Sequence, residues 1–301
     1  YIPDKRTANG LIVFEPEDFE EFYALLEATW DGKNPSYSVF YNNLFYRVER
    51  SMTIYGVQYC ARKMPEKVPS LSSLGFPAEL TNYLLTLSQC SGLILWSGPT
   101  GAGKTTSISS LLNEYLNMEG GFAYTIEDPT EQPLDGVYKS KRGGLGLCKH
   151  TLPIDGNWGE SLKSALRSKP RYILVGEIRT PDTASEVLRA ATSGHLVLST
   201  IHANNVTDAI TSVVKYASSA NMSEDLAYDL FSRGMLGVMH QNLVGTTVKK
   251  PHTTFLFANP DTTKGDQVRG IIKTGRVNLG TSIETQMTRM SRGLPLFPDL
   301  K

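Results

Sequence analysis

The sequence predicts an α/β fold in which a parallel sheet, covered by helices on both faces, follows a small α+β domain. Short apolar strands alternate with helices through most of the chain, which is the order that builds a parallel sheet. A glycine-rich turn at residues 98–105 joins one of these strands directly to a helix. Pro65 and Pro69 separate this region from an aromatic-rich N-terminal segment, because proline continues neither a helix nor a strand ladder.

The composition is that of a globular protein without a global excess of charge. Of the 301 residues, 40% are hydrophobic, so the chain can bury the cores of two ordinary domains. Lys plus Arg and Asp plus Glu each number 30, which gives no strong signature of nucleic-acid binding. The longest apolar runs, such as 93–96 and 196–198, are far shorter than the roughly 20 residues of a membrane-spanning helix. We therefore expect no transmembrane segment.

The three cysteines indicate a reducing compartment. Cys60, Cys90 and Cys148 are scattered without a close pair, so they form neither a disulfide framework nor a zinc site. We therefore expect a cytoplasmic protein. The chain begins at Tyr1 rather than Met and shows no targeting pattern, so we expect its first domain to be truncated at the start.

The first domain is expected over residues 1–64. Phe19, Phe22, Tyr23 and Leu26 recur at the spacing of one helix face, which predicts a helix over 17–30. Two segments rich in aromatic and β-branched residues, 37–49 and 51–62, are predicted to be strands. Residues 65–77 then form a linker, and residues 78–301 form the larger domain with a helical C-terminal part.

In the larger domain the predicted elements alternate regularly. Strands are expected at 93–97, 122–126, 172–175 and 196–200, and helices from Lys104 and over 158–168. Two apolar stripes at helical spacing support the helices. Their members are Trp158, Leu162, Ala165 and Leu166 in one, and Ala184, Val187, Leu188 and Ala191 in the other.

The glycine-rich turn matches the P-loop pattern G-x-x-x-x-G-K-[ST], and it lies between a strand and a helix as that motif requires. Its glycines let backbone N–H groups turn toward phosphate oxygens, and the helix N-terminus adds a positive potential. Lys104 is expected to reach the β- and γ-phosphates of ATP, and the Thr105 hydroxyl to bind Mg²⁺. The predicted nucleotide-binding residues are Gly98, Thr100, Gly101, Ala102, Gly103, Lys104, Thr105 and Thr106.

A glutamate follows the strand 172–175, at the edge of the sheet where doubly wound proteins bind ligands. We expect Glu177 to orient or polarise the attacking water beside the γ-phosphate. The alternative is a glutamate that only stabilises a helix N-terminus.

An acidic cluster and two histidines follow or flank other strands. Glu127 and Asp128 come after the strand 122–126 and are predicted to hold Mg²⁺ directly or through its waters, with Glu131 as a further catalytic candidate; an acidic turn is the alternative. His195 and His202 flank the strand 196–200, so His202 lies at its carboxyl end and can sense the γ-phosphate. A purely structural histidine is the other interpretation.

These blocks together resemble the PilT-like family of secretion and type IV pilus traffic ATPases. Residues 98–106 resemble its Walker A motif, 125–131 its acidic box, 174–179 its Walker B motif and 192–202 its histidine box. The resemblance covers residues 40–245. It implies a RecA-like P-loop domain preceded by a PAS-like domain, with ATP and Mg²⁺ as cofactors.

The resemblance also implies a homohexamer that docks at the inner membrane through the membrane components of a secretion or pilus machine. ATP would lie between the two domains, with Arg47 and Arg62 contributed across the subunit interface. Solvated arginines on a half-exposed strand are the alternative for both positions.

Departures from the family pattern favour one branch. The segment 168–171, with Ser168, Lys169 and Arg171, replaces the acidic residues usual before the Walker B motif of pilus retraction members. This is closer to the DotB and TraJ branch of type IVB secretion and conjugation. Type IV pilus retraction is the alternative function, and a small-molecule kinase or a nucleotide switch without turnover are rivals from other classes. The region 235–243 matches the family only loosely, so no role is transferred to it.

Overall fold

The computed structural model describes the chain except residues 1, 4–10, 13–18, 155, 246–248 and 298–301. The chain forms two compact units, Tyr1–Glu66 and Lys67–Lys301. The division between them falls inside the segment 65–77 that the sequence assigns to a linker. The start of the predicted helix at 17–18 lies outside the described residues.

The first unit is a helix packed on an antiparallel sheet. Its three-stranded sheet has the order β3-β4-β5, and α1 contributes Leu26 to a small core with Val39 and Val48. The sequence-predicted α+β character is confirmed. The elements are β1 Ile2–Pro3, β2 Leu11–Ile12, α1 Phe19–Thr29, β3 Ser36–Tyr41, β4 Leu44–Thr53 and β5 Gly56–Lys63.

The prediction of one strand through 37–49 is wrong. Asn42 and Asn43 have φ of 47° and 61°, a pair of left-handed residues that makes a tight hairpin turn. This turn ends β3 and starts β4, which then continues to Thr53. Asparagine is one of the few residues that tolerate this conformation. The prediction missed the turn because aromatic and β-branched residues lie on both sides of it.

The second unit alternates strands and helices as the sequence predicts. The predicted strand over 172–175 and the predicted helix start at Lys104 agree with the structure. The elements are η1 Leu71–Leu74, α2 Ala78–Thr86, η2 Leu87–Gln89, β6 Gly92–Ser97, α3 Lys104–Glu119, β7 Gly121–Ile126, β8 Gly136–Lys139, β9 Leu145–Thr151, α4 Trp158–Arg167, β10 Tyr172–Val175, α5 Pro181–Ala191, β11 Leu196–Ile201, α6 Val206–Ser218, α7 Glu224–Gly234, β12 Met235–Val244, β13 Lys250–Phe257, α8 Gln267–Lys273 and α9 Gly280–Ser291.

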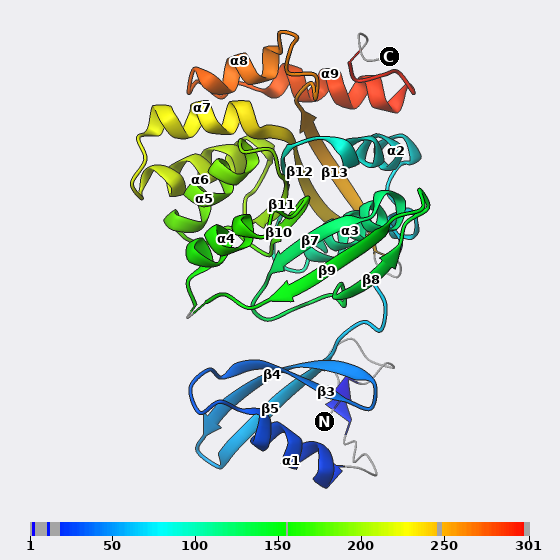
Figure 1. Ribbon diagram of the computed structural model, residues 1–301, viewed down its shortest axis with the longest axis vertical. Coiled ribbons are helices and arrows are strands. Elements are labelled where there is room, and N and C mark those ends of the chain that lie inside the picture. The colour runs from blue at the N-terminus through cyan, green and yellow to red at the C-terminus, as the bar shows by residue number, and fades with distance from the viewer. Residues whose placement is uncertain (1, 4–10, 13–18, 155, 246–248, 298–301) are drawn as a thin grey trace. The chain divides into compact units, whose positions relative to one another are not determined.

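These strands form a single eight-stranded sheet with the order β13-β12-β6-β11-β10-β7-β9-β8. All neighbours from β12 to β9 pair in parallel, whereas β13 and β8 are antiparallel at the two edges. Helices α4 to α7 lie on one side of the sheet, and α2 and α3 on the other (Figure 1). The predicted α/β class is therefore confirmed.

The alternation along β6 shows how the sheet divides two cores. Leu93 and Leu95 pack with the side chains of α4 to α7, while Ile94 and Trp96 pack with those of α2 and α3. Successive side chains of a strand point to opposite faces, so a strand buried on both sides must be apolar throughout. This explains why the run 92–97 lacks the polar alternation of a half-exposed strand.

Most of the segment predicted as a linker belongs to the second core. Leu71 is fully buried, and Phe76 lies with its ring centroid 6.3 Å from that of Trp96. Their burial ties residues after Lys67 to the second unit.

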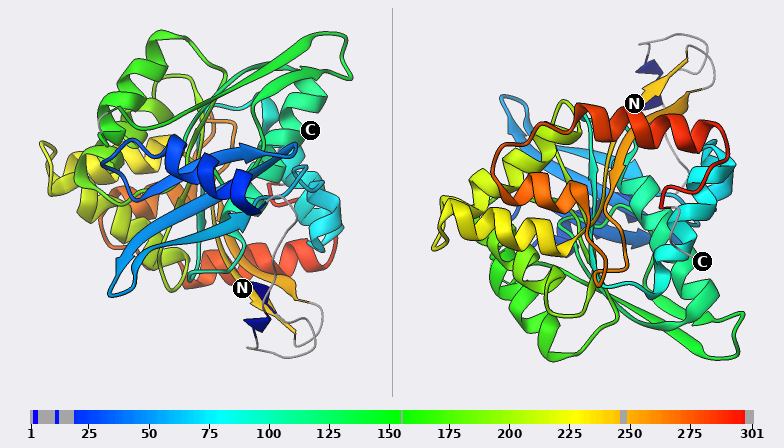
Figure 2. Two further views of the ribbon diagram at one scale, coloured as in Figure 1. Left: turned by 90° about the horizontal axis from the view of Figure 1, so that it is seen from below. Right: turned by 90° about the horizontal axis from the view of Figure 1, so that it is seen from above.

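The C-terminal part contains β13 followed by α8 and α9, drawn in orange and red in Figure 2. Gln286 of α9 accepts a hydrogen bond from the backbone N–H of Phe257 at 2.8 Å and donates one to its carbonyl at 2.7 Å. This buried amide attaches the helix to the edge strand. No helix among the described residues is long and apolar enough to cross a membrane.

Replacing Gly237 of β12 with alanine should destabilise the sheet. A Cβ at this position would lie 2.4 Å from Cδ1 and 2.6 Å from Cε1 of Phe257, so we expect a loss of about 1–3 kcal/mol in the free energy of unfolding. Urea denaturation measures it. Gly270 in α8 has nothing within 4 Å of such an atom, so Gly270→Ala should be neutral or stabilise by about 0.5–1 kcal/mol. Equal effects of the two changes would contradict the packing argument.

Candidate functional site

Four neighbouring parallel strands have their carboxyl ends side by side, along one end of the sheet. β6, β11, β10 and β7 are consecutive neighbours, so the segments that follow them are brought together although they are far apart in the sequence. The glycine-rich loop follows β6, and the other three strands are followed by Glu127 (β7), Glu177 (β10) and His202 (β11).

The loop after β6 has the backbone that phosphate binding needs. Gly98, Gly101 and Gly103 have φ of 148°, 76° and 80°, values that favour glycine. Lys104 starts α3, whose free N–H groups and dipole face the loop. Such a loop at a helix N-terminus is suited to an anion.

The ammonium of Lys104 lies inside the loop. Its Nζ donates hydrogen bonds to the carbonyls of Gly98 and Pro99, both at 2.9 Å, and the residue is only 7% exposed. Burial lowers the pKa of Lys104, and the carboxylates of Glu177 and Glu131 act in the opposite direction. A buried cation without its full complement of negative charge attracts a phosphate.

Glu177 lies at the centre of a chain of charged and polar groups. Its Oε2 accepts hydrogen bonds from Nη2 and Nε of Arg179 at 2.6 and 2.7 Å. Its Oε1 lies 3.3 Å from Nε2 of His202, and Nδ1 of the same ring lies 3.5 Å from Nζ of Lys104. A neutral imidazole protonated at Nε2 can donate to the glutamate and accept from the lysine. One ring therefore links the candidate base to the P-loop lysine.

The acidic cluster divides between a buried and an exposed part. Glu127 is 2% exposed, while Asp128 and Glu131 are exposed. Burial, and secondarily the charge of Glu131, raises the pKa of Glu127 to about 8. Glu177 raises the pKa of Arg179, and the two exposed carboxylates add to this effect. Asp128 and Glu131 therefore lie close enough to act on the same site.

The donor set fits a magnesium ion held mainly by nucleotide and water. Within the described residues, Oε2 of Glu127 makes no hydrogen bond, and Nδ1 of His150 lies 3.5 Å away. Such an unpaired buried oxygen suits a cation or a cation-bound water. The described part of the chain has no group of three or more His, Cys, Asp or Glu side chains able to hold a metal. Mg²⁺ often takes only one or two protein oxygens alongside phosphates, so Thr105, Glu127 and Asp128 remain its predicted ligands.

The other predicted nucleotide-binding residues differ in exposure and in hydrogen bonding. Thr100 and Gly101 are exposed, whereas Ala102 is buried and its N–H bonds the carbonyl of Pro99 at 3.3 Å. Thr106, in the first turn of α3, accepts a hydrogen bond from the Gln132 side chain at 3.5 Å. The accessible part of the loop is thus the part expected to meet phosphate.

Three residues outside the predicted set contribute to the site. Arg179 could have been suspected because it follows Glu177 by two positions. His150, at the end of β9, is hydrogen-bonded to the hydroxyls of Thr125 and Thr130, and burial lowers its pKa to about 4. Gln241 of β12 is buried beneath the glycine-rich loop. The sequence signals for Gln241 are a polar residue next to an apolar run and the loose family match of 235–243, and both are too weak to single it out.

One predicted histidine lies at the other end of its strand, and two predicted arginines belong to the first unit. His195 precedes β11 and therefore belongs to the opposite edge of the sheet from His202. Arg47 and Arg62 belong to the first unit, where they pair directly across β4 and β5. Directly paired residues project from the same face of a sheet, so these two cations share one face; Arg62 is exposed and Arg47 half-buried. Their proposed role toward ATP stays a prediction.

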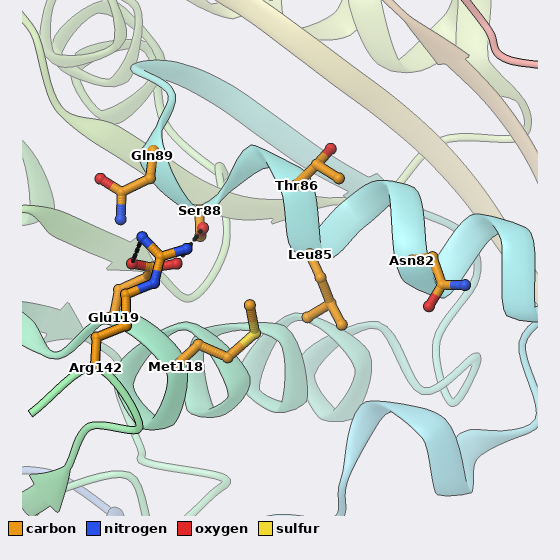
Figure 3. A pocket seen from close by; sticks show the side chains of 8 residues that line it. All are labelled: Asn82, Leu85, Thr86, Ser88, Gln89, Met118, Glu119 and Arg142. Atoms are coloured by element: carbon orange, nitrogen blue, oxygen red, sulfur yellow. Dashed lines mark hydrogen bonds and ion pairs between the residues drawn. The ribbon is translucent and has the colours of Figure 1, made fainter. Parts of the chain in front are cut away.

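A pocket of about 320 Å³ lies at the far end of α3 (Figure 3). Glu119 accepts a hydrogen bond from Ser88 at 3.2 Å and pairs with Arg142 at 2.9 Å. The start and end of α3 are roughly 22 Å apart, so this pocket is separate from the glycine-rich loop. Its lining residues are Asn82, Leu85, Thr86, Ser88, Gln89, Met118, Glu119 and Arg142.

Comparison with known sequences gives consistent results. The family described as type II/IV secretion system protein matches residues 36–283. A putative type II secretion system protein E of Escherichia coli is 33% identical over 207 residues, which are 67% of this chain and 38% of that protein. A twitching motility protein of Neisseria gonorrhoeae is 29% identical over 266 residues, 84% of this chain and 68% of that protein. The chain thus spans well under half the length of the first of these relatives.

Comparison with solved structures supports the same fold. The pilus retraction motor PilT with bound ADP aligns with a TM-score of 0.70 and 24% identity, covering 93% of this chain and 78% of that one. The ATPase DotB of Legionella pneumophila aligns with a TM-score of 0.65 and 22% identity, covering 91% and 76%. At this level of identity the similarity concerns the architecture.

The buried carboxyl of Glu127 predicts an unusual dependence of stability on pH. Because its pKa is raised from 4.5 to about 8 in the folded state, the unfolded chain releases a proton that the folded chain keeps between these values, so stability falls as pH rises through this window. Without Mg²⁺ or nucleotide, Glu127→Gln should raise the free energy of unfolding at pH 8 by on the order of 2–4 kcal/mol and change it little at pH 4.5.

Chemical denaturation of both proteins at several pH values measures this difference. The matched control is Glu284→Gln, which alters an exposed carboxyl beyond the first turn of α9 and should leave the pH profile nearly unchanged. A constant difference between wild type and Glu127→Gln across the window would contradict a protonated Glu127.

Proposed function

Because this chain belongs to the type II/IV secretion system protein family, we propose that it is a Mg-ATP-hydrolysing motor of a secretion or pilus machine. The observation that carries this proposal is the convergence at one sheet edge of a P-loop lysine, a histidine and a glutamate linked to an arginine. Each group has a separate part in the hydrolysis of a phosphoanhydride.

The loop and α3 would hold the phosphates. Inward N–H groups of residues 100–105 and the helix N-terminus would contact phosphate oxygens, while Nζ of Lys104 would exchange its bonds to Gly98 and Pro99 for bonds to the phosphates. Thr105, with Glu127 and Asp128, would bind Mg²⁺, which supplies neutralisation of the phosphate charge.

Glu177 would orient the attacking water. Its carboxylate is held between Arg179 and His202, so its direction is fixed before the substrate arrives, and a preorganised base needs little rearrangement during reaction. His202 lies between this base and Lys104, where it can respond to the γ-phosphate. Glu131 is the alternative base, since its charge also acts on Lys104.

For the machine, we propose type IV secretion or conjugation of the DotB and TraJ kind. The basic segment 168–171, which precedes β10 and Glu177, supports this branch. Type IV pilus retraction is the second candidate, favoured by the similarity to the Neisseria twitching motility protein over 84% of this chain. Complementation of a retraction-deficient strain and of a conjugation-deficient strain with this chain distinguishes them.

The working form is proposed to be a homohexamer in the cytoplasm, docked on inner-membrane components of its machine. The shared face of Arg47 and Arg62 gives one surface from which both cations can approach ATP held by a neighbouring subunit. Particle images of the nucleotide-bound protein test the subunit number. Release of phosphate to water, measured against transfer to an acceptor, distinguishes an ATPase from a small-molecule kinase or a switch without turnover.

Glu177→Gln should separate nucleotide binding from hydrolysis. The amide keeps the shape of the side chain but lacks the charge that orients water, so we expect ATP affinity near that of wild type and a kcat lowered on the order of 10²-fold or more. Lys104→Ala, the comparison variant, should lose both because it removes the cation aimed at the phosphates. Equal loss of binding and turnover in Glu177→Gln would make Glu131 the better candidate for the base.

Mixed rings should reveal whether the arginines act across subunits. An Arg47→Ala or Arg62→Ala subunit keeps its P-loop, and a Lys104→Ala subunit keeps its arginines, so a mixed ring contains some complete sites. ATPase activity should recover above that of either parent, because such an arginine can be worth roughly 10³-fold. If samples verified to contain mixed hexamers show no recovery of ATPase activity, that arginine does not act across subunits and is a solvated surface residue.

A further inference from the structure

Gln241 of β12 occupies a position that no part of the proposed mechanism uses. It is 2% exposed, lies directly beneath the glycine-rich loop, and bonds to three separate elements. We propose that Gln241 is a positioning residue that holds this loop in its nucleotide-binding form. The inference rests on the proposed function, since it assumes that the loop binds a nucleotide.

The Gln241 amide joins the loop to the strand before it and the helix after it. Its Oε1 accepts hydrogen bonds from the indole N–H of Trp96 at 2.8 Å and from the hydroxyl of Ser107 at 2.9 Å. Its Nε2 donates to the carbonyl of Ala102 at 2.6 Å. These partners belong to β6, α3 and the loop between them, so one side chain bonds to the strand before the loop, to the loop itself and to the helix after it.

The bond to Ala102 determines which way a loop N–H points. The peptide unit between Ala102 and Gly103 is planar and trans, so its C=O and N–H point in opposite directions. Because Gln241 binds the carbonyl of Ala102 from the side of β12, the N–H of Gly103 points away from β12. It then faces the side where phosphate oxygens are expected. Without that bond, the peptide unit could rotate and withdraw the donor.

Two glycines of the motif lie against the same residue, and at Gly98 a side chain would clash with it. A Cβ on Gly98 would lie 2.2 Å from the backbone oxygen of Gln241, and one on Gly103 would lie 3.2 Å from its Nε2. The loop therefore lies in contact with β12, and its glycines serve this close approach as well as their positive φ values.

The backbone of Gln241 is itself fixed by the sheet. β12 pairs in parallel with β6 up to His240, which is opposite Ser97, and Ser97 also contacts Nδ1 of His240 at 3.2 Å and donates to the carbonyl of Met239 at 3.0 Å. Gln241 is the next residue, so its side chain starts from a rigid point. A rigid support of this kind is what a positioning residue needs.

The test compares Gln241→Met with a matched control far from the loop. Gln241→Met keeps a similar volume but removes all three hydrogen bonds. Gln286→Met likewise removes a buried amide, bonded twice to the backbone of Phe257, and should lower Tm without touching the loop. Binding of Mg-ADP is measured by calorimetry well below the Tm of each protein.

We expect Gln241→Met to raise the Kd for Mg-ADP on the order of tenfold or more, because the unpaired carbonyl of Ala102 lets the loop reorient. Gln286→Met should keep the wild-type Kd. Gln241→Asn, which retains an amide but is one methylene shorter, should also bind more weakly, and it provides the test if the methionine variant does not fold.

The outcomes are distinct. If the Gln241 variants have a lowered Tm, as Gln286→Met has, but keep the wild-type Kd for Mg-ADP, the positioning role is overturned. The proposed function is then unaffected. A wild-type chain that binds no Mg-ADP would overturn the proposed function, and the positioning role with it. Weaker binding confined to the Gln241 variants supports the inference.

Discussion

The parallel pairing of β6 with β11 on one side and β12 on the other is the constraint on which the site depends. This pairing aligns Ser97 with both Ile201 and His240. The next residue on each strand is part of the site: the glycine-rich loop begins after Ser97, His202 follows Ile201, and Gln241 follows His240. A shift of either register would separate these groups, and the two cores on the faces of the sheet oppose such a shift because each strand is buried on both sides.

Electrostatics at this edge is balanced over several residues. Lys104 is buried with backbone carbonyls as its direct partners, and the carboxylate that acts most strongly on its pKa, Glu177, is already engaged by Arg179 and His202. Glu127 keeps its proton near neutral pH because burial raises its pKa. The site therefore holds less negative charge than its residue types suggest, which favours the arrival of an anionic nucleotide.

Much of the fold and part of the site followed from local patterns. The alternation of strands and helices, the P-loop glycines and the family resemblance were predicted, and the family is confirmed over residues 36–283. Glu177 and His202 were singled out because each follows an apolar strand, and the structure places their side chains 3.3 Å apart. The hairpin at Asn42 was missed because most of its flanking residues are aromatic or apolar and favour strands. Gln241 and His150 make hydrogen bonds to residues 20 or more positions away, and no local pattern records such contacts.

The sequence by itself determined the class of fold, the glycine-rich loop with its P-loop pattern and the family, because these depend on residue types at short, fixed spacings. Only the tertiary structure decided which side chains meet. It showed that Arg179 and His202 hold the two oxygens of Glu177, that Glu127 is buried while Asp128 is exposed, and that the Gln241 amide of β12 donates a hydrogen bond to the glycine-rich loop. The physical reason is that hydrogen bonding, burial and the pKa values that follow from them depend on distances in space, which strand order and register set.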